Sequence, residues 1–500
     1  MKPMIVVLLT ALLLAMGIQA EDNLGLPGIP VEAPSDPQPE GDWQVTRHQV
    51  EIEGEAIDYT ATAGTIQLKN DKDEAKASVF FISYTRNGVE DLGKRPVMFC
   101  FNGGPGSSSV WLHMGCFGPR RVHMDEVGHA VGPPYSLRDN PLSLLDTTDL
   151  VFIDPVSTGF SRVEEGTNTS EYHSVSGDIR SVSEFIRLWI TKFDRWLSPK
   201  YLAGESYGTT RAAGVANYLR SRSIDLNGIV LVSAVLSFQT LRFDEGNDLP
   251  YQLYVPTYTA LARYHGKLDA WEDLELPELL DQAEAWSREV YGPALMQGAE
   301  LDHARRREVA EQLSAYIGLP TELILQSDLR IPQWRFSDHL LAEQRQTVGR
   351  FDGRITGPDL DPIGERSGTS DPSYYRVAGG FTATFNDYVR NELGYETEKN
   401  YGILVGLNWN YDRVRASYLN VAGDLRRAMA ENPELRVYVA AGYYDLATPY
   451  HAAEYTFNHS ITHPDARERV TFGYFESGHM VFTHQDSLVK LRGELVEFFE

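Results

Sequence analysis

The stretch Leu202-Ala-Gly-Glu-Ser-Tyr-Gly-Thr209 decides the fold of this 500-residue chain. It contains a Gly-x-Ser-x-Gly pattern centred on Ser206. The apolar residues before the pattern predict a short strand, and residues 210–219 after it predict a helix. A sharp turn from strand to helix projects a serine hydroxyl above a sheet, and flanking glycines permit the strained backbone. The five-residue pattern alone also occurs by chance, but between a predicted strand and a predicted helix it predicts that Ser206 is a nucleophile.

Two further residues follow in the order acid and then histidine, which this type of turn requires. Residues 436–445 form an apolar strand pattern that ends in Asp445, and the next strand pattern, at 469–475, leads to His479. Both residues follow the carboxyl ends of successive strands, where open α/β sheets place their sites. Alone, Asp445 is explained as a turn residue and His479 as a loop histidine. The ordered trio favours catalysis and predicts an α/β-hydrolase fold with a mostly parallel central sheet.

A glycine-rich loop offers the anion-stabilising groups that such a site needs. The apolar strand pattern of residues 95–101 opens into Asn102-Gly-Gly-Pro-Gly-Ser-Ser108. Glycines let the backbone approach a substrate, so that a main-chain N–H faces the developing negative charge. The N–H of Tyr207, directly after the nucleophile, is the second predicted donor. Phosphate binding is a poor alternative, because Pro105 interrupts the spacing of a Walker motif.

Four blocks of the sequence together resemble the serine carboxypeptidases. The resemblance extends from about residue 49 to residue 500 and is weaker between about 240 and 400. The low cysteine count and the short amino-terminal signal suit a bacterial branch of the family. The blocks are Asn102-Gly-Gly-Pro-Gly-Ser-Ser108, Asp154-Pro-Val-Ser-Thr-Gly-Phe-Ser161, Gly204-Glu-Ser-Tyr-Gly208 and Gly478-His-Met480.

The resemblance implies removal of C-terminal residues from peptides through an acyl-enzyme. Ser206 would be the nucleophile, His479 the base and Asp445 the residue that orients the base. Gly104 and Tyr207 would supply the N–H groups of the oxyanion hole. A helical insertion would cover the site.

The resemblance also implies a clamp for the terminal carboxylate of the substrate, formed here by Asn102 and Glu205. A proton shared between two carboxyls raises an apparent pKa and favours acidic conditions. The alternative for Glu205 is that this position of the turn is free to vary. The clamp is implied by analogy with the family and does not follow from the geometry of the strand-to-helix turn.

The chain departs from the family pattern at the second clamp residue. Where the family has a glutamate two residues before a Gly-Pro pair, this chain has Cys116. Arg211, Arg120 and Arg121 are candidate replacements, since a guanidinium binds a carboxylate through paired N–H groups. The alternative is that each is a solvated or salt-bridged arginine.

The predicted domain organisation has four parts. Residues 1–20 read as a secretory signal peptide, because their apolar core of about 13 residues is shorter than the ~20 that a membrane anchor needs. Residues 21–45 form a Pro-rich flexible leader. The catalytic domain comprises 46–240 and 401–500, with a helix at 411–430, and 241–400 forms a mostly helical cap or, alternatively, a separate domain.

Composition excludes several classes of function. The chain has 70 acidic and 45 basic residues and a net charge of −25, so neither nucleic acid nor an anionic membrane is an expected partner. Cys100 and Cys116 are the two cysteines; a disulfide is open to them, but free buried thiols are favoured. His459 and His463 lack further ligands, so no metal and no cofactor are predicted.

The sequence therefore predicts an exported, periplasmic or secreted serine carboxypeptidase that acts on peptides with a free C-terminus. Its oligomeric state is left open. The first alternative is an esterase or acyltransferase with the same three residues, to which a missing clamp glutamate would redirect the chemistry. The second is a non-catalytic binding protein on a hydrolase scaffold, which would have no need for an intact trio.

Overall fold

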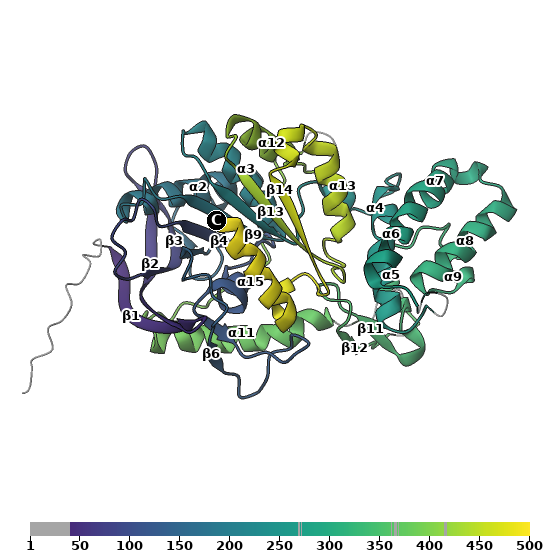
Figure 1. Ribbon diagram of the computed structural model, residues 1–500, viewed down its shortest axis with the longest axis horizontal. Coiled ribbons are helices and arrows are strands. Elements are labelled where there is room, and N and C mark those ends of the chain that lie inside the picture. The colour runs from purple at the N-terminus through teal and green to yellow at the C-terminus, as the bar shows by residue number, and fades with distance from the viewer. Residues whose placement is uncertain are drawn as a thin grey trace, which may run out of the picture. The chain divides into compact units, whose positions relative to one another are not determined.

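A ten-stranded sheet forms the centre of the computed structural model (Figure 1). The structure describes residues 41–500 except 269–270, 272, 362, 365–367, 369 and 415–417. The predicted signal peptide and the leader up to residue 40 lie outside the described residues. No helix of the described chain has the length and apolar character to cross a bilayer.

The first three strands of the sheet are antiparallel and the remaining main strands are parallel. The order is β1-β2-β3-β7-β4-β9-β10-β13-β14, with β8 paired to β3. Strands β7 to β14 in this order pair in parallel, which confirms the predicted mostly parallel sheet. The bounds are β1 Asp42–Ile52, β2 Glu55–Lys69, β3 Ala75–Arg86, β4 Val97–Phe101, β7 Asp149–Ile153, β8 Arg162–Val163, β9 Lys200–Glu205, β10 Gly228–Val232, β13 Arg436–Gly442 and β14 Val470–Phe475.

The parallel strands are buried on both faces because alternate side chains enter two separate cores. In β4, Phe99 packs in one apolar cluster, while Cys100 packs in the other. The first cluster includes α2 Val175–Lys192, α3 Tyr207–Ser221, α12 Ala422–Glu431 and α13 Tyr450–Ser460. The second includes α1 Val110–Leu112, η1 His113–Phe117, α11 Pro372–Asn391 and α15 Gln485–Phe499.

The inserted helices surround an apolar cluster of their own, which continues to the end of β13 through Ala441 and Tyr444. The insertion contains α4 Leu249–Leu253, α5 Val255–Tyr264, α6 Leu276–Trp286, η5 Ser287–Tyr291, α7 Gly292–Gln297, α8 His303–Ile317, α9 Thr321–Gln326, α10 Gln333–His339 and the hairpin β11 Gln346–Val348 with β12 Thr356–Pro358. Helix α11, which the sequence assigned to the cap, packs instead against the sheet through Phe381 and Phe385. The helices therefore cease to pack within the insertion, and begin to pack on the sheet, before residue 372 and not at residue 400.

The helix predicted at 411–430 begins only at Ala422. The preceding described residues are irregular because they cap another helix. The N–H of Val175 donates to the carbonyl of Asn410, and the N–H of Ser176 donates to the Asp412 carboxylate at 3.0 Å. These contacts satisfy free N–H groups at the first turn of α2, so tertiary bonding overrides the local helical pattern.

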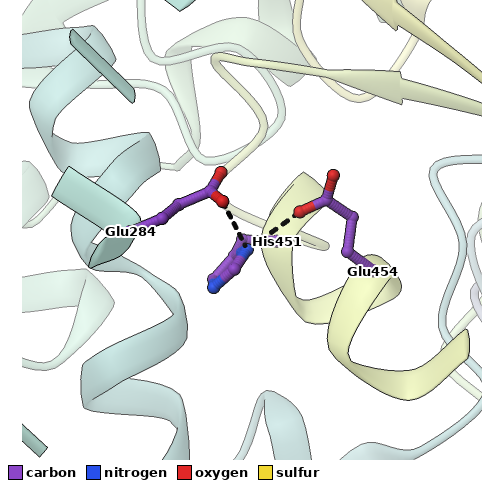
Figure 2. Close-up of side chains that lie close together, drawn as sticks. All are labelled: Glu284, His451 and Glu454. Carbon is purple, nitrogen blue, oxygen red and sulfur yellow. Dashed lines mark hydrogen bonds and ion pairs between the residues drawn. The ribbon is translucent and has the colours of Figure 1, made fainter. Parts of the chain in front are cut away.

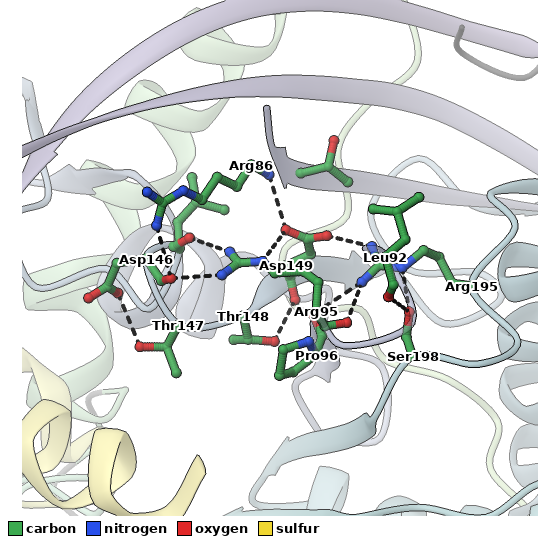
Figure 3. Close-up of polar contacts among 12 residues, drawn as sticks. Arg86, Leu92, Arg95, Pro96, Asp146, Thr147, Thr148, Asp149, Arg195 and Ser198 are labelled. Carbon is green, nitrogen blue, oxygen red and sulfur yellow. Dashed lines mark hydrogen bonds and ion pairs between the residues drawn. The ribbon is translucent and has the colours of Figure 1, made fainter. Parts of the chain in front are cut away.

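A buried cluster of charges surrounds the first residue of β7, Asp149 (Figure 3). Asp149 is 1% exposed and accepts bonds from Arg95, at 3.1 Å, and from Arg195. Arg95 also donates to the carbonyl of Asp146 at 2.7 Å, and Arg195 donates to the carbonyl of Arg95 at 2.7 Å. One carboxylate therefore neutralises two buried guanidinium groups that tie separate loops together.

Replacing Asp149 with alanine is expected to lower the free energy of unfolding by about 3–5 kcal/mol, because it leaves two buried cations without their anion. Urea unfolding followed by fluorescence measures the change. Asp225→Ala is the control, since it removes an exposed partner of Arg220 and should cost under about 1 kcal/mol. Equal losses for the two variants would contradict the role of the buried cluster.

Candidate active site

Ser206 lies at the turn between β9 and α3 in a strained conformation. Its φ of 60° and ψ of −128° fall in a region that non-glycine residues rarely adopt. Gly204 and Gly208 make the turn sterically feasible. A Cβ atom at Gly204 would lie 2.3 Å from the carbonyl oxygen of Gly208, and one at Gly208 would lie 2.8 Å from that of Phe101. The sequence pattern thus has the geometry of a nucleophile elbow.

Asp445 and His479 lie together at the carboxyl ends of β13 and β14. His479 Nδ1 is 2.8 Å from Asp445 Oδ2, and both residues are buried. The other carboxylate oxygen accepts the N–H groups of Ala447, at 2.7 Å, and Thr448, at 3.0 Å. The hydroxyl of Thr448 donates to Oδ2 at 2.7 Å. This set of donors holds the carboxylate in place and directs one oxygen at the imidazole.

The environment of His479 favours its charged form. Burial lowers its pKa, but the attraction of Asp445 and the hydrogen bond to it outweigh burial, and Glu205 adds to the rise. Phe351 stacks on the imidazole at a centroid distance of 5.1 Å and an interplanar angle of 19°. The N–H of His479 also donates to the carbonyl of Phe351. A residue from outside the sheet therefore fixes the plane of the ring.

Ser206 and His479 line one cavity of about 360 Å³. No hydrogen bond joins their side chains among the described residues, and catalytic hydrogen bonds of this kind often tighten only in the complex with substrate. Aromatic and polar groups share the lining. Its other residues are Asn102, Gly103, Gly104, Pro105, Ser107, Trp111, Glu205, Arg350, Phe351, Tyr374, Leu404, Val405, Gly406 and Met480.

The glycine-rich loop packs directly against the turn that holds Ser206. A Cβ atom at Gly103 would lie 2.4 Å from the nitrogen of Tyr207, so only glycine allows this approach. Tyr207 is the first residue of α3, and its N–H therefore has no acceptor within the helix. Gly104, at φ +100°, lines the same cavity. Gly104 thus lines the same cavity as Ser206, and Tyr207 follows Ser206 directly.

Asn102 and Glu205 are joined by a hydrogen bond in the cavity wall. Asn102 Nδ2 donates to Glu205 Oε2 at 2.7 Å, and the N–H of Leu112 fixes the amide by donating to Asn102 Oδ1 at 3.1 Å. Burial raises the pKa of Glu205 to about 7, although His479 and the bond from Asn102 oppose the rise. Below neutral pH this side chain is a neutral acid that can donate a hydrogen bond.

Cys116 adjoins this pair but cannot share its proton as a carboxyl would. The thiol is buried in η1, and burial raises its pKa well above the ordinary value, with Glu205 adding to the rise. Cys100 is also buried, and both cysteines are free, so no disulfide joins them. The second clamp position therefore holds a neutral thiol.

The three arginines that the sequence offered as replacements are engaged elsewhere, and none lines the cavity. Arg211 is buried, pairs with Asp178 at 2.8 Å and lies over the ring of Tyr207. Arg120 bonds Asp139 and Glu392, and Arg121 donates to Gln485 at 2.7 Å. The cation that does line the cavity is Arg350, which sequence reasoning missed because it lies in the insertion and outside every motif.

A second polar cluster links the insertion to the sheet domain (Figure 2). His451 Nδ1 lies 2.8 Å from Glu454 on the same helix and 3.5 Å from Glu284 of α6. The hydroxyl groups of Tyr450 and Tyr474 donate to the two carboxylates. The potential metal-ligating atoms lie within 4.8 Å of one another. Since His451 already contacts both carboxylates through Nδ1, the cluster serves as a polar link between α6 and α13. His459, which the sequence analysis considered together with His463, is not part of this cluster, and its Nδ1 bonds the carbonyl of Tyr455.

The mostly parallel sheet with helices on both faces is an α/β-hydrolase fold. A similar solved structure is Kex1Δp, a prohormone-processing carboxypeptidase from Saccharomyces cerevisiae. It has a TM-score of 0.54 and 18% identity, covering 88% of this chain and 91% of that chain, and this likeness concerns the fold. Residues 54–241 match the family described as serine carboxypeptidase. This part of the chain is thus similar to the serine carboxypeptidases, as the sequence blocks within it predict, whereas the bacterial branch stays a prediction.

Two curated relatives from Arabidopsis thaliana match about a third of the chain. Serine carboxypeptidase-like 5 is 32% identical over 172 residues, which cover 32% of this chain and 37% of that protein. Serine carboxypeptidase-like 4 is 30% identical over 170 residues, which cover 32% and 36%. The chain therefore spans little more than a third of the length of these relatives.

Proposed function

We propose that the protein is an exported serine carboxypeptidase that removes C-terminal residues from peptides. The observation that carries the proposal is the Asn102–Glu205 hydrogen bond in the wall of the cavity that also holds Ser206. A neutral carboxylic acid and an amide both bind a carboxylate by donating hydrogen bonds. A free C-terminal carboxylate would therefore be held beside the nucleophile. Export rests on the signal pattern of residues 1–20.

Five polar groups take part in the proposed mechanism: three side chains and two backbone N–H groups. His479 takes the proton of Ser206 as its oxygen attacks the last peptide carbonyl, and the N–H groups of Gly104 and Tyr207 stabilise the oxyanion. The C–N bond then breaks, and His479 gives its proton to the leaving amine. Water, activated by His479, attacks the acyl-enzyme and releases the shortened peptide while Ser206 regains its proton. Asp445 holds the imidazole in the required tautomer.

An esterase or acyltransferase with the same trio is the second candidate. Cys116 favours it, because a buried neutral thiol contributes no second carboxyl to the clamp. A clamp of one carboxyl and one amide would bind the substrate carboxylate less tightly. Substrates without a free carboxylate would then compete better.

A matched set of three substrates separates the candidates. The set consists of an N-blocked dipeptide with a free C-terminus, its C-terminal amide and its methyl ester, each assayed with the full chain and with Ser206→Ala. Faster release of the last residue from the free acid than from the amide, lost in the variant, supports the carboxypeptidase. Ester turnover with the free acid untouched refutes it and leaves a serine esterase.

Glu205 should make peptide cleavage dependent on pH. Because its pKa is raised to about 7, it donates to the substrate carboxylate below that pH and repels it above. We expect kcat/KM for the free-acid peptide to fall as pH rises through about 7, approaching about tenfold per unit. Glu205→Gln keeps a donor at every pH and should abolish this fall. Ester kcat/KM serves as the control; an equal fall for the ester would reject the clamp.

A further inference from the structure

Arg350 is anchored through its backbone in the wall of the catalytic cavity. Its N–H donates to Asp371 Oδ1 at 3.1 Å, and its carbonyl accepts the N–H of Leu446 at 3.1 Å, next to Asp445. The side chain itself is exposed and lines the cavity. The main chain is thus held in place while the guanidinium remains available to a ligand.

The guanidinium lies one aromatic ring away from the candidate base. Its central carbon is 5.6 Å from the centroid of Phe351, whose ring stacks on His479. Arg350 also lowers the pKa of His479, which opposes the rise that Asp445 causes. Through the ring of Phe351, Arg350 therefore lies on the His479 side of the cavity.

Within the described part of the chain the guanidinium of Arg350 forms no ion pair with a carboxylate, and its side-chain contact is the ring of Phe351. Asp371, which is bonded to the backbone of Arg350, accepts the N–H groups of Arg350 and Phe351 and the hydroxyl of Ser373. Arg354, four residues further on, shows the contrast, since it pairs with Asp352 at 2.7 Å. In a chain of net charge −25, a cation that faces a substrate cavity without an anion is suited to an anionic ligand.

The mechanism indicates which part of a substrate reaches this cation. His479 must give its proton to the leaving amine, so the leaving residue lies beside His479. Its α-carboxylate is held by Asn102 and Glu205 under the proposed function. Its side chain is left to face the wall that Phe351 and Arg350 form.

We propose that Arg350 makes the cavity selective for peptides whose C-terminal residue is glutamate or aspartate. This inference rests on the proposed carboxypeptidase function. The guanidinium would bind the side-chain carboxylate through two parallel N–H bonds, which a lysine could not reproduce. Arg350 would thus determine specificity without taking part in the bond-breaking steps.

The test uses three N-blocked dipeptides that end in Glu, Gln or Lys and are otherwise identical. For the unaltered chain, kcat/KM should be at least about tenfold higher for the Glu peptide than for the Gln peptide. Arg350→Gln should bring this ratio to about one through loss on the Glu peptide, and Arg350→Glu should favour the Lys peptide. Arg376→Gln is the matched control: it removes an exposed arginine of α11 that does not line the cavity, and it should keep the ratio.

Each other outcome has a distinct meaning. If Arg350→Gln slows all three peptides equally, Arg350 binds the α-carboxylate or supports the fold, and the selectivity proposal is wrong. A Gln or Lys preference in the unaltered chain also overturns it. If the unaltered chain cleaves an ester but none of the three peptides, the proposed carboxypeptidase function itself fails.

Discussion

Replacing Ser206 with alanine is expected to lower kcat about 10⁶-fold for peptides and esters alike, since serine, histidine and acid of such a trio act as a unit. The strained turn should persist, because alanine must adopt the same positive φ as serine. The cavity and the clamp should therefore still bind a substrate. Steady-state kinetics, with binding of a non-cleaved peptide measured in parallel, test this directly.

Ser206→Gly is the informative companion variant. It removes the hydroxyl as alanine does, but glycine adopts a φ of 60° without strain. We expect the same loss of activity together with a free energy of unfolding about 1 kcal/mol higher than that of the serine protein. Residual activity above one-hundredth in either variant would show that another group is the nucleophile.

Asp445→Asn should lower kcat about 10⁴-fold, and the hydrogen bonds of the acid explain why. The N–H groups of Ala447 and Thr448 bind Oδ1, so an asparagine would place its oxygen there and its NH₂ group toward His479. Nδ1 would then become an acceptor, and the proton would move to Nε2. An imidazole in that form cannot take the proton of Ser206.

The loss of Asp445 should also lower the pKa of His479, because this carboxylate is the main group that raises it against burial. The acidic limb of the kcat profile should consequently move to lower pH. Asp486→Asn, which removes an exposed carboxylate at the start of α15, is the control and should change kcat less than twofold. A loss below tenfold in Asp445→Asn would exclude it as the orienting acid.

Local patterns predicted the scaffold well for a physical reason. Strands such as β4 and β10 are buried on both faces and read as continuous apolar runs, and the turn at Ser206 needs glycines at fixed positions. The order of nucleophile, acid and histidine then follows from the order of the parallel strands. The structure brings Asp445 and His479 into contact as that order predicts.

Local sequence patterns could not predict how distant segments pack together. The amphipathic helix α11 has an apolar face that fits either a cap or a sheet, and only the tertiary structure shows Phe381 against the sheet. Residues around Asn410 are irregular because they cap α2, which lies far away in the sequence. Arg350 has no motif, and its place near His479 depends on the contact between His479 and the loop that joins β11 to β12.

Covalent labelling with a fluorophosphonate, followed by peptide mapping in a mass spectrometer, tests the central claim most directly. Such a reagent reacts with a serine only when a neighbouring base and an oxyanion hole activate it. The account predicts a single adduct on the peptide that contains Ser206, absent in Ser206→Ala and strongly reduced in Asp445→Asn. A folded protein that carries no adduct on Ser206, or an adduct on another serine, would contradict it.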